Sequence, residues 1–402
     1  MGIGTKRNTK CDCGSGEKYK KCCGISETST VLKSMEKNAQ TANKVIPPEE
    51  FIPKWYSGLC SKDEINRLLN KSTPSDFLLQ VRADQIMDHT RLYRVIIARG
   101  WADSPDLTSN FSNVEFRSYI NNLPNDKKLL CKQIEKGYVF SGDANGKYMR
   151  SPYGDLIIIS ESLKYFLFYM NLFFLNYNKE IPLDVRFSSL MIAVRIMLQT
   201  EALDFDIDPR GIIPDEITKI NRLYVNEQMQ FVIGHEYSHY LLSHLDKSNT
   251  CFEPLCFVKD DISPRKYEFY NYRQEQEFAA DVASIINPIH DNEIFESKIQ
   301  AAIFFLIYID IFQKVKEQIL PSISYIKTHP DPIDRIWNLY DKCKDKLKIV
   351  TVDFINSQID LANEYSEILQ KHVALNFEEY EVYGSVYLGQ WRGKPLIDRV
   401  DY

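Results

Sequence analysis

Hydrophobic residues in this chain recur mainly three and four positions apart, the spacing that places side chains on one face of an α-helix. The first long stretch of this kind is Ser75–Arg99, which follows Pro74 and opens with a serine that can cap a helix. From residue 183 onward the helical stretches are longer and more apolar, as expected of helices in a core. They cover Val185–Leu203, Asn226–Leu245, Gln274–Ile286, Asn292–Ile319 and Ile355–Leu375. The pattern predicts a mainly α-helical protein.

Two segments carry weaker signs of β-structure. Gly137–Leu156 has a short β-like pattern, although its glycines also fit loops. Tyr380–Leu388 is rich in tyrosine and valine and predicts strands, which would give the chain an α/β tail.

Composition changes along the chain and predicts five segments. Residues 1–24 contain four of the nine cysteines and six lysines or arginines, and residues 25–50 form a polar linker. A helical N-terminal domain is expected over 51–182, a core over 183–345 and a C-terminal extension over 346–402.

The overall composition narrows the function classes. A hydrophobic fraction of 44% excludes a disordered or collagen-like chain, and a formal charge of −6 does not favour nucleic acid as a partner. Nine cysteines are few for the length and odd in number, which favours a reducing compartment. No apolar segment of a secretory signal lies near Met1, and the longest strictly apolar run, Ala301–Ile309, falls short of the roughly 20 residues of a membrane span. We expect a cytoplasmic protein with no membrane span.

Four cysteines, Cys11, Cys13, Cys22 and Cys23, lie close together in the first segment. Thiolates at such short spacings can hold a tetrahedral zinc ion, and a segment this small needs a metal to fold. The stretch Lys10–Gly24, with its Gly-Ser-Gly and Lys-Tyr-Lys-Lys elements, resembles the SEC-C motif, the zinc-binding knuckle at the end of the SecA translocation ATPase. The resemblance implies a structural zinc ion and a docking role toward a protein partner or substrate, with Cys23 standing where other members have histidine.

A second metal site is predicted by the sequence His235-Glu236-Tyr-Ser-His239 within a helical stretch. Histidines four residues apart share a helix face and can bind one zinc ion, while Glu236 is placed to take a proton from an attacking water molecule. The His-Glu-x-x-His pattern alone is suggestive, because chance produces it in roughly one such sequence per hundred.

A catalytic zinc ion also needs a third protein ligand and an open position. Glu277 is predicted as that ligand, because Asp281 follows one helical turn later and can accept a hydrogen bond from a ligand imidazole. Glu275 is the rival, but an alanine stands four residues after it. His244 is five residues beyond His239, about 140° around an ideal helix, and is predicted to have no role in the site.

Residues 225–340 resemble the gluzincin metallopeptidases, in particular the group that includes HtpX and the CAAX prenyl proteases. The resemblance rests on His235–His239, on Glu277-Phe-Ala-Ala-Asp281 and on Thr328-His329-Pro330 followed by Arg335-Ile336. It implies a zincin-like core. Those relatives have transmembrane helices, which this chain is not expected to have, so the soluble Lit-type phage-exclusion peptidase is a looser analogue.

Two residues of the third motif admit two interpretations. His329 or Arg335 shapes the active site and stabilises the oxyanion formed at the scissile carbonyl. Alternatively, His329 turns the chain into the next helix, and Arg335 pairs with an acid such as Asp281 or Asp331.

The function predicted from these patterns is a zinc endopeptidase acting on a protein substrate, with one catalytic and one structural zinc ion. The alternative is a non-catalytic adaptor that binds a protein or nucleic acid through the knuckle. The presence of Glu236 argues against it, because a protein without activity does not need the catalytic base. Nucleic-acid binding through the lysines of the first segment is the weakest prediction. Cys251 and Cys256 are interpreted as buried reduced cysteines rather than as a regulatory pair.

Overall fold

The structure is a computed structural model that describes residues 53–100, 105–141, 144–175, 177, 181–244, 251–253, 267–269, 274–319 and 330–393, together with residues 10, 17, 18 and 21. The chain forms two compact units, Met1–Lys54 and Trp55–Tyr402. The boundary between them lies beside the predicted end of the linker at residue 50. The predicted segments that follow the linker all belong to the second unit, apart from residues 51–54.

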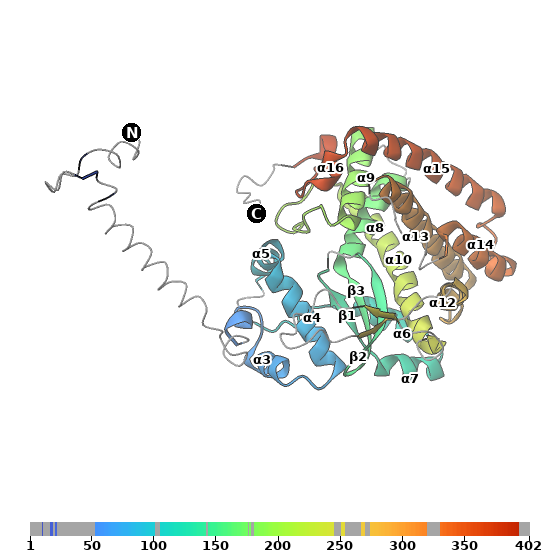
Figure 1. Ribbon diagram of the computed structural model, residues 1–402. Coiled ribbons are helices and arrows are strands. Elements are labelled where there is room, and N and C mark those ends of the chain that lie inside the picture. Colours follow the sequence, from blue (N-terminus) through green and yellow to red (C-terminus); the bar gives the residue numbers. More distant parts are fainter. Residues whose placement is uncertain are drawn as a thin grey trace. The chain divides into compact units, whose positions relative to one another are not determined.

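The second unit is mainly helical, as its periodicity predicts (Figure 1). Its N-terminal helices are α3 (Lys62–Leu69), α4 (Pro74–Asp88), α5 (Thr90–Ala98), α6 (Val114–Asn121), α7 (Asn125–Gln133), α8 (Glu161–Phe174) and α9 (Leu183–Met197). The later helices are α10 (Asp215–Leu241), α12 (Gln274–Ile286), α13 (Asn292–Ile319), α14 (Pro332–Cys343), α15 (Val352–Leu375) and α16 (Glu378–Glu381).

Predicted and observed helix bounds coincide for α12 and α13 and differ elsewhere for local reasons. The stretch Ser75–Arg99 is two helices, because the backbone of His89 is extended between α4 and α5. Helix α10 begins well before the predicted Asn226, directly after Pro214 and with Asp215 and Glu216 in its first turn. Acidic side chains at that position interact favourably with the unpaired N–H groups of a helix start.

Within the described residues, a small sheet of five strands lies among the helices, in the order β1-β3-β2-β5-β4. Strands β1 (Glu135–Val139) and β3 (Gly154–Ser160) are parallel, and β2 (Gly146–Ser151) forms an antiparallel hairpin with β3. On the other side β2 pairs with β5 (Tyr267–Phe269), which pairs with β4 (Cys251–Glu253). The weak β-pattern of Gly137–Leu156 therefore marks true strands.

Helices α4 and α10 cover opposite faces of this sheet (Figure 1). On one face, Phe77 and Val81 of α4 pack with Met149 and Leu156 in a buried cluster. Side chains alternate between the faces of a strand, so the neighbours of Met149 in β2 point toward α10. This arrangement brings the His-Glu-x-x-His helix against β2.

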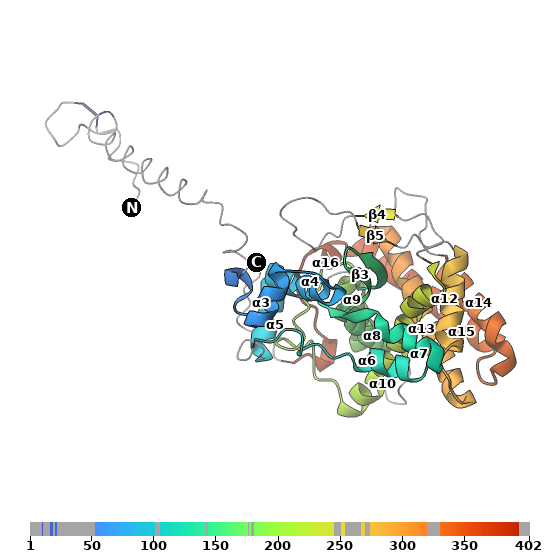
Figure 2. The same ribbon diagram turned by 90° about the horizontal axis from the view of Figure 1, so that it is seen from below.

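Helices α12 to α15 lie on the far side of α10 from α4 (Figure 2). Seen from below, α12, α13, α14 and α15 lie on one side of the unit and α3, α4 and α5 on the other (Figure 2). Helix α13 is buried along most of its length and packs against α10, α14 and α15. Among the described helices, none has both the length and the apolar character that crossing a membrane requires.

The prediction of strands over Tyr380–Leu388 is wrong. In the described part of the tail this segment contains the end of α16 and then an extended chain with one isolated bridge, between Gly384 and Glu201. Its backbone groups bond to the segment that follows α9 rather than to a sheet: Gly384 N–H donates to Thr200, and Leu388 N–H donates to Arg210. The alternation of tyrosine and valine fits an extended chain whose partner lies far away in the sequence.

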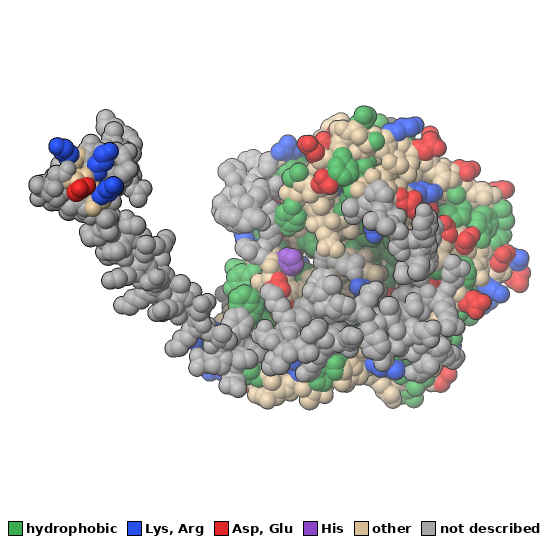
Figure 3. All heavy atoms as spheres, viewed as in Figure 1, with side chains coloured by type: hydrophobic (Ala, Val, Ile, Leu, Met, Phe, Trp, Pro, Cys, Tyr) green, Lys and Arg blue, Asp and Glu red, His purple; other side chains and the backbone are tan. Residues whose placement is uncertain are grey.

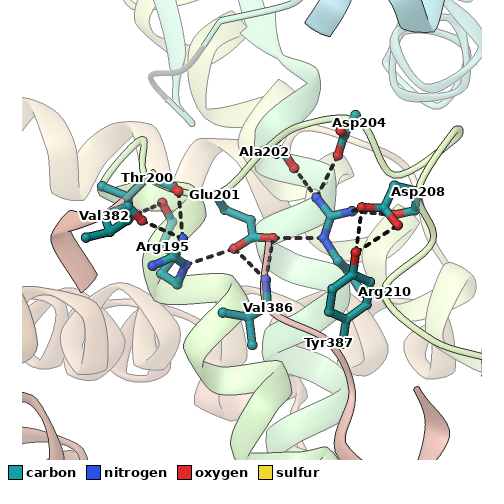
Figure 4. A network of polar contacts seen from close by, with 10 residues as sticks. All are labelled: Arg195, Thr200, Glu201, Ala202, Asp204, Asp208, Arg210, Val382, Val386 and Tyr387. Atoms are coloured by element: carbon teal, nitrogen blue, oxygen red, sulfur yellow. Dashed lines mark hydrogen bonds and ion pairs between the residues drawn. The ribbon is translucent and has the colours of Figure 1, made fainter. Parts of the chain in front are cut away.

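Buried charges hold this tail in place (Figure 4). The Glu201 carboxylate accepts hydrogen bonds from Arg195 Nε at 2.9 Å and from Arg210 Nε at 2.8 Å, and it also accepts from Val386 N–H at 3.2 Å. Tyr387 donates its hydroxyl to Asp208 at 2.9 Å. Arg195, Glu201, Arg210 and Asp208 are all at most 3% exposed. The tail is therefore joined to the core by hydrogen bonds to charged side chains that pair with one another away from water.

Candidate metal centre

The C-terminal half of α10 lies in the interior of the second unit, where every residue from Gln228 to His239 is buried. Gly234 makes this position possible. A Cβ at Gly234 would lie 2.6 Å from Cε2 of Tyr119, whose ring stacks on Tyr237 with centroids 5.7 Å apart. Only glycine lets α6 approach α10 so closely. The residue directly before His235 thus fixes the depth of the motif in the core.

The structure brings together the side chains of His235, His239 and Glu277, and all three are buried. The Nε2 atoms of the two histidines lie 3.0 Å apart. Glu277 reaches them from α12, with Oε2 at 3.5 Å from His235 Nε2 and Oε1 at 3.3 Å from His239 Nε2. Glu275, the rival ligand, is exposed on the same helix. Packing of α12 against α10 selects Glu277.

The spacing of these atoms fits a tetrahedral zinc ion. Zinc bonds to nitrogen and oxygen of about 2.0–2.1 Å place neighbouring ligand atoms of a tetrahedron about 3.3–3.4 Å apart. The measured separations of 3.0, 3.3 and 3.5 Å lie on both sides of that value. Two imidazoles and one carboxylate are a donor set that zinc accepts while keeping a fourth position open.

The buried charges around the triad also fit a divalent cation. Glu236, Glu277 and Asp281 carry three negative charges, Arg335 carries one positive charge, and each is at most 8% exposed. With both histidines neutral, as they are when they bind a metal ion, the formal charges of these four side chains sum to −2, which one divalent cation would neutralise. Because unbalanced charge in the interior is costly, this arrangement favours a bound metal ion.

The two histidines respond to these charges in opposite directions. Burial opposes protonation of His235, but Glu277 and Asp281 outweigh it and raise its pKa to about 10. Burial and the neighbouring charge of His235 lower the pKa of His239 to about 3. Without a metal ion, the acidic side chains therefore favour a proton on His235 and none on His239, and a bound cation would meet the same electrostatic demand.

Asp281 and Arg335 lie on the Nδ1 side of His235, away from Glu277. Asp281 Oδ1 lies 2.9 Å from His235 Nδ1. Arg335, on α14, donates Nε to Asp281 Oδ2 at 2.7 Å and Nη2 to Asp281 Oδ1 at 2.6 Å. Arg335 thus adopts the second of the two arrangements considered from the sequence, in which its guanidinium pairs with Asp281. It acts through Asp281 on the orientation of His235, as outer partners of a metal ligand do.

We expect Asp281→Asn to destabilise the folded protein by roughly 3–5 kcal/mol, because the buried Arg335 guanidinium loses the carboxylate to which it donates two hydrogen bonds and keeps only the more distant Glu277, at 3.5 Å. Urea unfolding of the metal-free protein measures this change. The double variant Asp281→Asn/Arg335→Gln should lose less than the sum of the two single variants, since neither charge is then left alone. Strictly additive losses would contradict the pairing.

The matched control for this prediction is Asp341→Asn. Asp341 forms an exposed ion pair with Lys344 at 3.2 Å, with its side chain 66% exposed. Solvent screens such a pair, so the change should cost less than about 1 kcal/mol.

Glu236 faces β2, and the strand backbone binds it. Tyr148 N–H donates to Glu236 Oε2 at 2.7 Å. A Cβ at Gly146 would lie 3.2 Å from Glu236 Oε1 and 3.1 Å from Val232, so glycine lets the strand approach the carboxylate. Neither Gly146 nor Tyr148 is predicted from the sequence to belong to the site. A glycine inside a strand is a sign of close backbone approach and is the signal that could have found them.

The prediction that His244 points away from the metal ligands is wrong. His244 is buried, and its Nδ1 atom lies 2.8 Å from Nδ1 of His239. The prediction assumed that the helix continues to residue 244, whereas α10 ends at Leu241 and Ser243 has a left-handed backbone with φ 54°. The chain therefore turns back over the last helical turn.

Several predicted residues lie outside the described part of the structure. These are His329 of the third motif, Cys256, and the four cysteines of the first segment, Cys11, Cys13, Cys22 and Cys23. Cys251 belongs to β4. The described residues of the first unit, Lys10, Glu17, Lys18 and Lys21, are all exposed, and Figure 3 shows basic and acidic side chains there. The backbones of Lys10 and Lys18 form an isolated antiparallel β-bridge.

Comparison with known proteins identifies one segment. Residues 7–25 match the SEC-C motif, a zinc-binding motif, which agrees with the resemblance seen over Lys10–Gly24. No curated protein and no solved structure matches this chain.

Proposed function

We propose that the second unit is a zinc-dependent peptidase that hydrolyses peptide bonds of a protein substrate. The observation that carries the proposal is the buried triangle of His235, His239 and Glu277 with Glu236 beside it on α10. The ordered motifs that resemble gluzincin metallopeptidases, and the zincin-like core that they imply, belong to the same proposal.

The residues of the site have different roles in the proposed reaction. His235, His239 and Glu277 would hold zinc, which when bound acts as a Lewis acid toward the scissile carbonyl and lowers the pKa of a water molecule. Glu236 takes a proton from the attacking water and returns it to the leaving amine. The N–H group of Tyr148 orients the Glu236 carboxylate, and Asp281 orients His235.

The SEC-C segment extends the proposal beyond catalysis. Its four cysteines would hold a second, structural zinc ion, and the knuckle would dock a protein partner or the substrate. Its agreement with a known motif also keeps the adaptor as a second candidate, in which the knuckle binds a partner and the second unit has no activity.

Zinc content tests both metal sites. We expect about two zinc ions per chain in the wild type, and about one in Cys22→Ser/Cys23→Ser and in Glu277→Gln. The matched control Glu275→Gln makes the same chemical change at an exposed position of α12 and should keep both ions. Metal analysis of the purified full chain gives these numbers. Equal zinc content in Glu277→Gln and Glu275→Gln would contradict the assignment of the third ligand.

The activity is tested by incubating a cell extract with the purified protein and mapping new peptide N-termini. Cleavage should stop when zinc is removed by a chelator and return when zinc is added back. Absence of zinc-dependent cleavage in every extract tested, with two ions bound, would favour the adaptor.

A further inference from the structure

Helix α10 ends in a turn that returns the chain onto the metal-binding face. Leu242 N–H donates to Ser238 O at 2.9 Å, Ser243 N–H donates to Tyr240 O at 2.9 Å, and Ser243 adopts the left-handed conformation. The left-handed Ser243 and the hydrogen bond from its N–H to Tyr240 O are two features of a Schellman motif, a common ending of α-helices. In such an ending the residue after the left-handed one packs on the helical residue five positions before it. Here these two residues are His244 and His239.

The contact between the two rings resembles the support of the other histidine ligand. Asp281 Oδ1 lies 2.9 Å from Nδ1 of His235, and His244 Nδ1 lies 2.8 Å from Nδ1 of His239. His239 is fully buried and His244 is 5% exposed, so water competes little for either nitrogen. Each histidine of the triad therefore has a partner at the nitrogen that faces away from Glu277.

The geometry also assigns the protons. The Nε2 atom of His239 faces His235 and Glu277, so its lone pair would be the one that binds a metal ion. A neutral imidazole that ligates through Nε2 carries its hydrogen on Nδ1 and donates it. His244 Nδ1 must then accept, with the hydrogen of that ring on Nε2.

We infer that His244 is a positioning residue that fixes the tautomer and ring orientation of His239 for zinc binding. The inference rests on the proposed zinc site. Outer partners of ligand histidines typically contribute about 10–100-fold to metal affinity. What the position requires is a hydrogen-bond acceptor at the place of Nδ1, and the imidazole is one way to supply it.

A set of variants separates this role from simple packing. In His244→Asn the Oδ1 atom can occupy the place of Nδ1 and accept the same hydrogen bond. His244→Leu fills similar space without an acceptor, and His244→Met serves the same purpose if the leucine variant does not fold. Ser243→Gly favours the same left-handed turn and is the control for the turn itself.

The measurement is zinc affinity of the full chain, by competition with a chromophoric chelator in the Cys22→Ser/Cys23→Ser background, which leaves only the proposed catalytic site. We expect His244→Leu to weaken zinc binding by about 10–100-fold and His244→Asn to restore it to within about threefold of the parent. Ser243→Gly should match the parent.

The failures of the two proposals are distinguishable. If the parent binds zinc tightly and the leucine and asparagine variants bind equally well, or lose affinity equally, the positioning role is overturned while the zinc site stands. If the parent protein of this background binds no zinc, the proposed function and the inference both fall.

Discussion

Replacing Glu236 with glutamine is expected to reduce peptide hydrolysis by roughly 10²–10⁴-fold, the contribution typical of a general base. Glutamine keeps the size of the side chain, and its Oε1 can still accept the hydrogen bond that Tyr148 N–H donates at 2.7 Å in the native protein. What it loses is the ability to take a proton. The zinc content of the variant should remain that of the wild type, because Glu236 is not among the three residues proposed to hold the metal ion.

The measurement is a comparison of new peptide N-termini in cells that express the wild type, Glu236→Gln or Glu275→Gln. The last variant is the matched control, since Glu275 is exposed on α12 and loses the same charge without touching the site. Cleavage products common to the wild type and the control, and missing from Glu236→Gln, would also identify the substrate. If Glu236→Gln cleaves as well as the wild type, the proposed mechanism is wrong.

Replacing Glu201 with glutamine should destabilise the second unit by roughly 3–5 kcal/mol. The carboxylate lies between Arg195 and Arg210 with its side chain 0% exposed. Arg210 keeps Asp204 and Asp208 as partners, but Arg195 is left with the carbonyls of Thr200, Glu379 and Val382. An amide offers only one acceptor oxygen and no charge, so a buried guanidinium loses its counterion.

Urea unfolding of full-length Glu201→Gln gives the change in the free energy of unfolding, and limited proteolysis shows whether the segment after α16 becomes accessible. The control is Glu367→Gln on α15, whose ion pair with Lys371 spans 4.0 Å between side chains that are 73% and 77% exposed. That change should cost less than about 1 kcal/mol. Similar losses in the two variants would show that burial of the network contributes little to stability.

The sequence predicted well what depends on neighbours along one helix. His235, Glu236 and His239 share a face because of helical geometry alone, and the same periodicity gave the bounds of α12 and α13. The choice of Glu277 over Glu275 was also made from helix geometry, since Asp281 follows Glu277 by one turn, and the burial of Glu277 agrees with it.

The sequence failed where a helix stops or where a distant segment takes part. His244 was misplaced because an ideal helix was extended past Leu241, and the left-handed Ser243 was not foreseen. Tyr380–Leu388 has the composition of a strand but pairs with the segment after α9, nearly two hundred residues earlier. The strand propensity of a residue indicates that its backbone can be extended. Which segment it pairs with depends on the packing of the whole unit.

By itself, then, the sequence determined the helical character of the protein, the SEC-C motif and the three ordered motifs of the candidate site. Only the tertiary structure decided that Arg335 holds Asp281, that Tyr148 binds Glu236 and that His244 supports His239. The physical reason is the range of the interactions. Helical periodicity and metal-ligand spacing arise from bonded geometry over a few residues. The hydrogen bonds that orient the site residues form where separate elements pack together, or where a helix end folds back on its own last turn. Water is excluded there, so each buried donor and acceptor must be satisfied by a partner within the protein.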